Sequence, residues 1–98
     1  MIVRIVKMVI DNEHKLDYEN YINSVRSEIR AFEGCSYLEI WNGLNDKSVY
    51  FSYSYWESEA HLEEYRHSEL FNRIWPTIKQ WFAAKPEAWS VDKVFINP

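Results

Sequence analysis

The segment of residues 49–56, VYFSYSYW, constrains the fold more than any other, because as a β-strand it would carry aromatic rings on both of its faces. Successive side chains of a strand point to opposite faces of a sheet. One face therefore carries Phe51, Tyr53 and Tyr55, and the other carries Tyr50, Ser52, Ser54 and Trp56. Because both faces hold large apolar rings, we expect helices to cover one face and a second sheet to cover the other.

Further strands are predicted over residues 2–10, 35–41 and 89–96, where the sequence is β-branched, apolar or weakly alternating. Between the first two strands, apolar residues at helical spacing predict a helix that ends at Gly34, since glycine tolerates a left-handed backbone. A second helical region is expected to start at Ser58, bend near His67 and restart at Ser68, because serine caps helix N-termini. Pro76 lies inside this region and either kinks the helix or begins a fresh turn.

The resulting order, β-α-β-β-α-β, predicts an α+β fold of the ferredoxin-like type with a four-stranded antiparallel sheet. A length of 98 residues fits a single domain over residues 1–98. The chain nevertheless holds five Trp, seven Tyr and five Phe, which is more aromatic surface than so small a core can bury. We therefore expect a homodimer that forms through the sheet face with Phe51, Tyr53 and Tyr55.

Charge and composition argue against several classes of partner. The net charge is −4 and no basic stripe is visible, so we expect no nucleic-acid partner. No apolar run approaches the roughly 18 residues that a membrane helix needs, and Arg4 and Lys7 interrupt the apolar N-terminal segment. Cys35 is the only cysteine, which favours a reducing compartment and hence the cytoplasm. The three histidines lack the spacing of metal ligands, so no metal is expected.

Three segments carry a resemblance to a known family: Gly34-Cys35, the run YSYWESEA at residues 53–60, and SELF at residues 68–71. With these segments the sequence resembles the antibiotic biosynthesis monooxygenase domain family, whose members form dimeric α/β barrels on this fold. The resemblance extends over nearly the whole chain. The family includes cofactor-free quinol monooxygenases, haem-degrading enzymes and a signal-molecule isomerase, so the resemblance indicates a fold and a dimer more firmly than an activity.

The resemblance makes Trp56 the candidate catalytic residue, because a Trp at this position belongs to the polar and aromatic set of the cofactor-free monooxygenases. The Asn and the Tyr of that set fall on Ser52 and Leu62. Alternatively, Trp56 is a structural plug under the helix and its indole N–H donates to a nearby carbonyl. Ser52 and Ser54 are small enough to leave a pocket beside Trp56, unless the helices pack closer there.

Tyr65 and Trp75 are similar in position to the Trp and the axial His of the haem-degrading relatives. Trp75 cannot ligate iron, so haem degradation is disfavoured, and Tyr65 stands where the isomerase-like relatives have a His. The residues that we expect to line a substrate pocket are Ser52, Ser54, Leu62, Tyr65, Phe71 and Trp75.

The resemblance, together with the aromatic residues expected around the pocket, implies a cofactor-independent monooxygenase that oxidises a small aromatic quinol or phenol with dioxygen. The alternative is a non-catalytic dimeric module that binds a small hydrophobic or aromatic metabolite. A buried polar group with a perturbed pKa in the pocket would favour the enzyme, whereas an entirely apolar pocket would favour the binding module.

Overall fold

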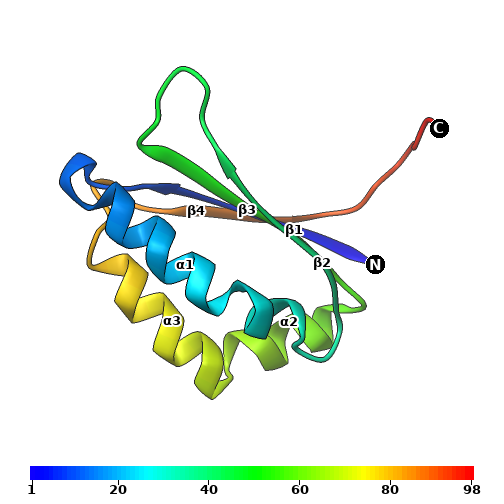
Figure 1. The fold of residues 1–98 in the computed structure, drawn as a ribbon. Coiled ribbons are helices and arrows are strands. Elements are labelled where there is room, and N and C mark those ends of the chain that lie inside the picture. Colours follow the sequence, from blue (N-terminus) through cyan, green and yellow to red (C-terminus); the bar gives the residue numbers. More distant parts are fainter.

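The protein forms one antiparallel sheet with three helices packed against one of its faces (Figure 1). The computed structural model describes residues 1–98. Its elements are β1 (Ile2–Val9), a 3₁₀ helix (Asn12–His14), α1 (Lys15–Arg30), β2 (Cys35–Asn42), β3 (Val49–Trp56), α2 (Glu59–Arg66), α3 (Glu69–Lys79) and β4 (Glu87–Val91). The predicted α+β, ferredoxin-like order is therefore confirmed.

The four strands lie in the order β2-β3-β1-β4, so β1 is central and pairs with both β3 and β4. Ile5, for example, is opposite Tyr53 on one side and opposite Trp89 on the other. Residues that are directly opposite share a face of the sheet. This register gives the sheet a face without helices, here called the uncovered face, which carries Val3, Ile5, Tyr37, Glu39, Trp41, Phe51, Tyr53, Tyr55 and Trp89.

The other face of the sheet, which the helices cover, holds the core. Tyr50, Ser54 and Trp56 of β3 are buried there, whereas Phe51 and Tyr53 on the uncovered face are only partly buried. The predicted alternation of β3 is thus confirmed. The main cluster of buried residues is Met8, Ile10, Tyr18, Ile22, Val25, Ile29, Tyr50, Ile74 and Ile78. A smaller cluster of Cys35, Trp56 and Leu62 lies near the start of α2.

The break between α2 and α3 occurs where the sequence predicted it. The Ser58 side chain accepts a hydrogen bond from the backbone N–H of His61 at 3.2 Å, and Ser68 accepts one from Phe71 at 3.1 Å. Each serine thereby satisfies a backbone donor that has no partner inside its helix. Pro76 lies inside α3, which continues to Lys79, so it does not begin a separate helix.

The structure corrects two predicted boundaries, the end of α1 and the end of β1. α1 ends at Arg30 rather than at Gly34, because the chain tightens into a turn after a right-handed Ala31: the Ala31 N–H donates to the Ser27 carbonyl and the Phe32 N–H to the Ile29 carbonyl. Gly34 instead lies in the turn before β2, where its φ of +92° belongs to the left-handed region. β1 ends at Val9, one residue early, since Ile10 forms only an isolated bridge with Phe82.

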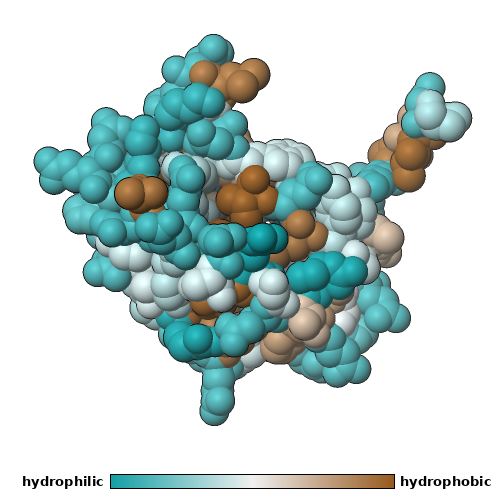
Figure 2. All heavy atoms as spheres, in the orientation of Figure 1, coloured by the Kyte–Doolittle hydropathy of each residue, from teal (hydrophilic) through white to brown (hydrophobic).

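The last strand is also corrected, from residues 89–96 to Glu87–Val91. Its pairing with β1 covers only the stretch of β1 from Val3 to Lys7, and beyond Val91 the chain leaves the sheet. Figure 1 shows the C-terminal segment extending away from the body of the molecule. The apolar side chains of Val94, Phe95 and Ile96 on this segment are exposed, and Figure 2 shows hydrophobic atoms on it.

None of the helices combines the length and the apolar character that crossing a membrane requires. Hydrophilic atoms dominate the part of the surface visible in Figure 2, with hydrophobic atoms in separate groups between them. The aromatic residues of the uncovered face are not covered by the chain's own helices.

We predict that Gly34→Ala destabilises the fold. A Cβ at position 34 would overlap the Cβ of His61, and the positive φ adds strain for any residue with a side chain. The free energy of unfolding should fall by about 2 kcal/mol or more, as measured by urea denaturation. Glu33→Ala changes the neighbouring exposed residue and is the control. Equal stability of the two variants would contradict the prediction.

Candidate functional site

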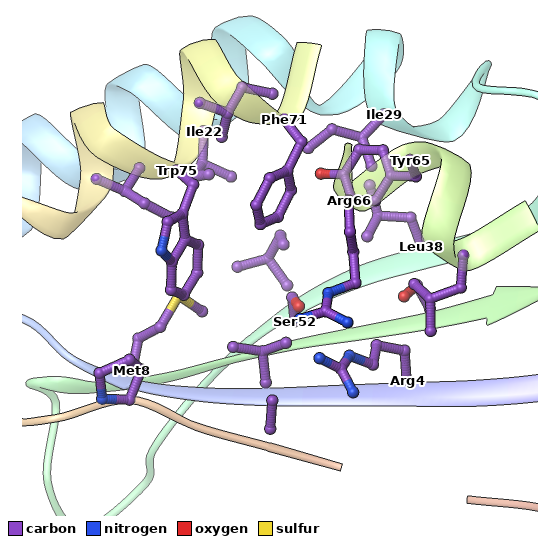
Figure 3. Close-up of a pocket in the computed structure, with 18 of the residues that line it drawn as sticks. Arg4, Met8, Ile22, Ile29, Leu38, Ser52, Tyr65, Arg66, Phe71 and Trp75 are labelled. Atoms are coloured by element: carbon purple, nitrogen blue, oxygen red, sulfur yellow. The ribbon is translucent and has the colours of Figure 1, made fainter. Parts of the chain in front are cut away.

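A cavity of about 290 Å³ lies between the helices and the covered face of the sheet (Figure 3). Hydrophobic residues make up 15 of the 21 residues that line it, so the wall is mostly apolar with a few polar groups, as in small-molecule sites. The predicted pocket residues all lie in this wall: Ser52, Ser54, Leu62, Tyr65, Phe71 and Trp75. Trp56 is part of the same wall. The structure thus brings together every residue that was assigned to the site.

The polar atom of Trp56 is already engaged inside the protein. Its indole Nε1–H donates to the Ser54 Oγ over 3.0 Å, and both side chains are buried. The partner of the indole is therefore a hydroxyl and not the carbonyl that the structural alternative predicted. A serine hydroxyl can accept a hydrogen bond and still donate its own proton. Consequently Ser54 is the group of this pair that can donate toward a molecule in the cavity.

Aromatic rings form a continuous part of the cavity wall. Trp56 stacks on Tyr65 with ring centroids 4.9 Å apart, and Phe71 stacks on Trp75 at 5.6 Å with an interplanar angle of 11°. Tyr65 also meets Phe71 edge-on at 5.2 Å, which links the two stacks. Flat apolar surfaces of this kind favour a planar ligand, because aromatic rings gain additional energy from stacked and edge-to-face contacts.

The tyrosines of the cavity are not proton acceptors at neutral pH. Burial raises the pKa of Tyr65 well above its usual range, and burial together with Tyr50 does the same for Tyr18. Both phenols therefore stay protonated, and Tyr18 donates to the sulfur of Met8. No three His, Cys, Asp or Glu side chains gather in a geometry that could hold a metal ion. Trp75, at the position of the haem ligand in the resemblance, stacks on Phe71 in the wall.

Two arginines that were not assigned to the site from the sequence also line the cavity. In Figure 3, Arg4 of β1 and Arg66 of α2 extend into the cavity beside Ser52. Arg4 donates to the Ser90 hydroxyl at 3.0 Å, and Arg66 forms an ion pair with Glu63 at 2.7 Å. Burial, followed by the charge of Arg66, lowers the pKa of Arg4. The side chain of Arg66 is 44% exposed, so the cavity reaches solvent beside α2.

The sequence carried a signal for one of these arginines. Arg4 interrupts an apolar strand and lies four residues before Met8. The side chains of both residues therefore point to the face that the helices cover. Such a charge in an otherwise apolar strand indicates either a solvent-exposed position or a functional one. Arg66 gave no comparable signal, because the direction of its side chain depends on how α2 lies relative to the sheet and on where α2 ends.

The uncovered face carries a second aromatic cluster. Tyr37 stacks on Tyr55 at 4.7 Å, and Trp41 stacks on Tyr53 at 4.4 Å. The carboxylate of Glu39 accepts hydrogen bonds from the side chains of Tyr37 and Trp41. Trp41 and Trp89 of the same face are 40% and 43% exposed. This cluster contains all three residues that were predicted to form a dimer interface, Phe51, Tyr53 and Tyr55.

Comparison with known proteins assigns the chain to a family. The model of the family described as antibiotic biosynthesis monooxygenase matches residues 1–76. The chain belongs to this family. The family assignment that the sequence resemblance predicted is thus confirmed, and the chain has the fold of the antibiotic biosynthesis monooxygenases. No curated protein matches the sequence.

Solved structures agree with the family assignment. An antibiotic biosynthesis monooxygenase superposes with a TM-score of 0.90 at 18% sequence identity, covering 96% of this chain and 99% of that one. A conserved protein from Methanosarcina mazei Go1 gives a TM-score of 0.88 at 21% identity, with 96% and 94% of the two chains covered. At such identities the likeness shows the fold alone.

We predict that stability falls as the pH rises above about 10, the ordinary pKa of tyrosine. In the unfolded chain Tyr65 loses its proton there, whereas burial keeps it protonated in the folded protein, so unfolding is favoured at higher pH. In Tyr65→Phe the fall should be shallower by about 1.4 kcal/mol per pH unit above pH 10. Urea denaturation across this range tests the prediction, with the pH 7 stability of each protein as its own reference. Equal slopes would contradict it.

Proposed function

We propose that this protein is a cofactor-independent monooxygenase that oxidises a small aromatic quinol or phenol with dioxygen. The observation that carries the proposal is the apolar cavity with one buried donor pair, Trp56 and Ser54, in its wall. Membership of the antibiotic biosynthesis monooxygenase family supports an oxygenase over other uses of such a cavity. The substrate class rests on the shape and the aromatic wall of the cavity.

The size of the cavity limits the substrate. An apolar cavity of about 150 Å³ is large enough for benzene, and the cavity here has about 290 Å³. A molecule of one or two fused rings therefore fits, whereas a ligand with three or more substituted rings would have to extend into solvent. The stacked pair of Phe71 and Trp75 offers a flat surface for such a ring system.

The chemistry belongs mostly to the substrate. A deprotonated quinol or phenol gives one electron to dioxygen, and the two radicals combine into a peroxide at a ring carbon that carries hydrogen. The O–O bond then breaks, so that one oxygen atom stays as a quinone carbonyl and the other leaves as water with the ring hydrogen and a proton. The protein contributes a dry site, orientation and hydrogen bonds to the oxygen on which negative charge develops.

Within this scheme Ser54 is the donor and Trp56 is its positioning residue. The indole N–H occupies one lone pair of the Ser54 hydroxyl, which turns the hydroxyl proton away from Trp56. A proton donor held in this way does not have to reorganise when charge develops on the substrate oxygen. Ser52 lies two residues earlier in β3, on the same wall, and adds a second hydroxyl. The phenolic proton leaves through water where the cavity reaches solvent beside Arg66.

A second candidate function is a binding module without catalysis. A buried group with a perturbed pKa in the pocket was expected to favour the enzyme, but the direction of the shift on the buried phenols of the cavity favours the binding module. Burial raises the pKa of Tyr18 and of Tyr65, so neither can accept a proton from the substrate at neutral pH. In this alternative the cavity holds a small aromatic or hydrophobic metabolite and the hydroxyls of Ser52 and Ser54 only orient it.

We further propose a homodimer in which the uncovered faces of two chains pack together, which makes the α/β barrel that the family resemblance implies. The half-exposed rings of Trp41 and Trp89 support this arrangement, because a contiguous aromatic group is costly to leave in water. The exposed apolar residues of the C-terminal segment, Val94, Phe95 and Ile96, offer additional surface for a second copy.

Neither a membrane nor a nucleic acid is part of the proposal. The partners that we propose are a second copy of the chain and a small aromatic molecule. A cytoplasmic location suits the single cysteine, because Cys35 is buried and has no second thiol in the chain.

We predict that the purified protein, without added flavin or metal, accelerates dioxygen uptake on dihydroxynaphthalenes or related quinols above the autoxidation rate in buffer. Ser54→Ala and Trp56→Phe should each slow turnover by about a hundredfold, as expected when one positioned donor is lost. Ser24→Ala removes an exposed hydroxyl on α1 and should behave as wild type. Wild-type rates equal to the buffer rate across the panel would favour the binding module. Circular dichroism checks that each variant is folded.

We predict a stable dimer at micromolar concentration, as measured by sedimentation. Tyr53→Asp places a charge in the middle of the uncovered face and should dissociate the dimer. Tyr53→Phe keeps the ring on Trp41 and should leave the dimer intact. A monomeric wild-type protein would contradict the proposed interface.

A further inference from the structure

The cavity contains a positive charge, on Arg4, that forms no ion pair within the fold. Arg4 donates to the neutral hydroxyl of Ser90 and takes part in none of the ion pairs of the protein. A guanidinium has five N–H donors, so most of those on Arg4 are free for another partner. Figure 3 shows Arg4 extending from β1 into the cavity, where Arg66 extends toward it from α2.

The nearby carboxylates do not supply that partner. Glu63 pairs with Arg66, and its side chain is 51% exposed. Glu87 also lines the cavity, but it lies directly opposite Lys7 of β1. The side chain of Lys7 points to the uncovered face. The strand geometry therefore assigns the Glu87 side chain to the opposite side of the sheet from Arg4.

Holding two guanidinium groups at one partly buried place is unfavourable for the empty protein. Like charges repel more strongly where the wall is apolar than in water. Arg4 carries the signs of this environment, since burial and then the charge of Arg66 lower its pKa, and the opposing effect of the Glu63 carboxylate offsets them only in part. An anion between the two groups would replace the repulsion by charge-assisted hydrogen bonds.

We propose that Arg4 and Arg66 bind the carboxylate of an aromatic acid whose ring lies against the Phe71–Trp75 stack. The inference rests on the proposed function, in which the cavity holds a small aromatic molecule, and it restricts that molecule to acids. The planar fork of a guanidinium matches a carboxylate in bidentate geometry. The hydroxyl of Ser52, beside the two arginines, can donate to the same group. A one- or two-ring acid fits the volume of about 290 Å³.

The test compares two probes that differ only in the carboxylate, 1-hydroxy-2-naphthoate and 1-naphthol, by isothermal titration calorimetry on the full chain. Wild type should bind the naphthoate at least about tenfold more tightly, since its carboxylate accepts charge-assisted hydrogen bonds that 1-naphthol cannot replace. Arg4→Gln should remove this preference while the affinity for 1-naphthol stays the same. Arg73→Gln, which removes an exposed arginine paired with Glu28, should bind both probes as wild type does.

Two further variants keep the test decisive if Arg4→Gln does not fold. Arg4→Lys retains the charge without the fork and should keep only part of the preference for the acid. Arg66→Gln changes a side chain that is 44% exposed, so the fold should tolerate it, and it should weaken naphthoate binding several-fold. Added salt should weaken the naphthoate and not the naphthol.

Several outcomes would overturn the proposal. Equal affinities of wild type for the two probes would do so, as would an Arg4→Gln protein that keeps the preference. Tighter binding of 1-naphthyl phosphate than of the naphthoate would overturn the assignment to a carboxylate. Because binding is measured without turnover, an acid that binds through Arg4 but is never oxidised would support this site and contradict the monooxygenase activity. Oxidation of neutral quinols by a protein without acid preference would do the reverse.

Discussion

The alternation of side chains along β3 is the constraint on which the rest of the structure depends. Each residue of a strand points to the face opposite that of its neighbours, so one eight-residue element supplies both the buried cluster under the helices and the aromatic cluster of the uncovered face. Pairing with β1 and β2 fixes the register of β3 on both sides. A slip by one residue would move Trp56 out of the core and bring Tyr55 into it.

The cavity exists because β3 places small residues opposite a helix layer that is interrupted. Ser52 and Ser54 leave space between the bulky side chains of Tyr50 and Trp56. The break at His67 lets α2 and α3 approach the sheet independently, and their aromatic residues surround that space without filling it. The hydrogen bond from Trp56 to Ser54 satisfies the buried indole, so the large ring can support the wall without an unpaired donor.

Local patterns in the sequence were sufficient to predict most of the fold. The strand over 49–56 and the serine caps at 58 and 68 depend on neighbouring residues, and each was predicted where it occurs. The extent of β4 depends on its pairing with the distant β1, so local patterns misplaced it. The end of α1 lies in a local turn at Ala31 and Phe32 that no glycine marks, so the search for a capping glycine placed it too late. Gly34, for example, was assigned to a helix cap, whereas the close approach of His61 shows that it serves the packing of α2 beside the turn.

The candidate site shows the same division. Ser52, Ser54 and Trp56 could be placed together because they share one strand, and the resemblance added the residues of α2 and α3. The indole of Trp56 was expected to face the substrate or a carbonyl, and the pairing with Ser54 could not be foreseen because it depends on the rotamers of both side chains. Arg66 could not be predicted at all, since its place in the wall is a property of how the helix lies on the sheet.

The central position of β1 has a consequence for the order in which the protein is built. The strand that is synthesised first lies between two strands that come later, and the Arg4–Ser90 hydrogen bond joins residues 86 positions apart. Contacts between such distant residues require the closure of a long loop and form slowly. During translation, β1 therefore leaves the backbone N–H and C=O groups of one edge unpaired until β4 has left the ribosome. The Ser90 contact that helps to hold Arg4 in the cavity wall is among the last parts of the molecule to form.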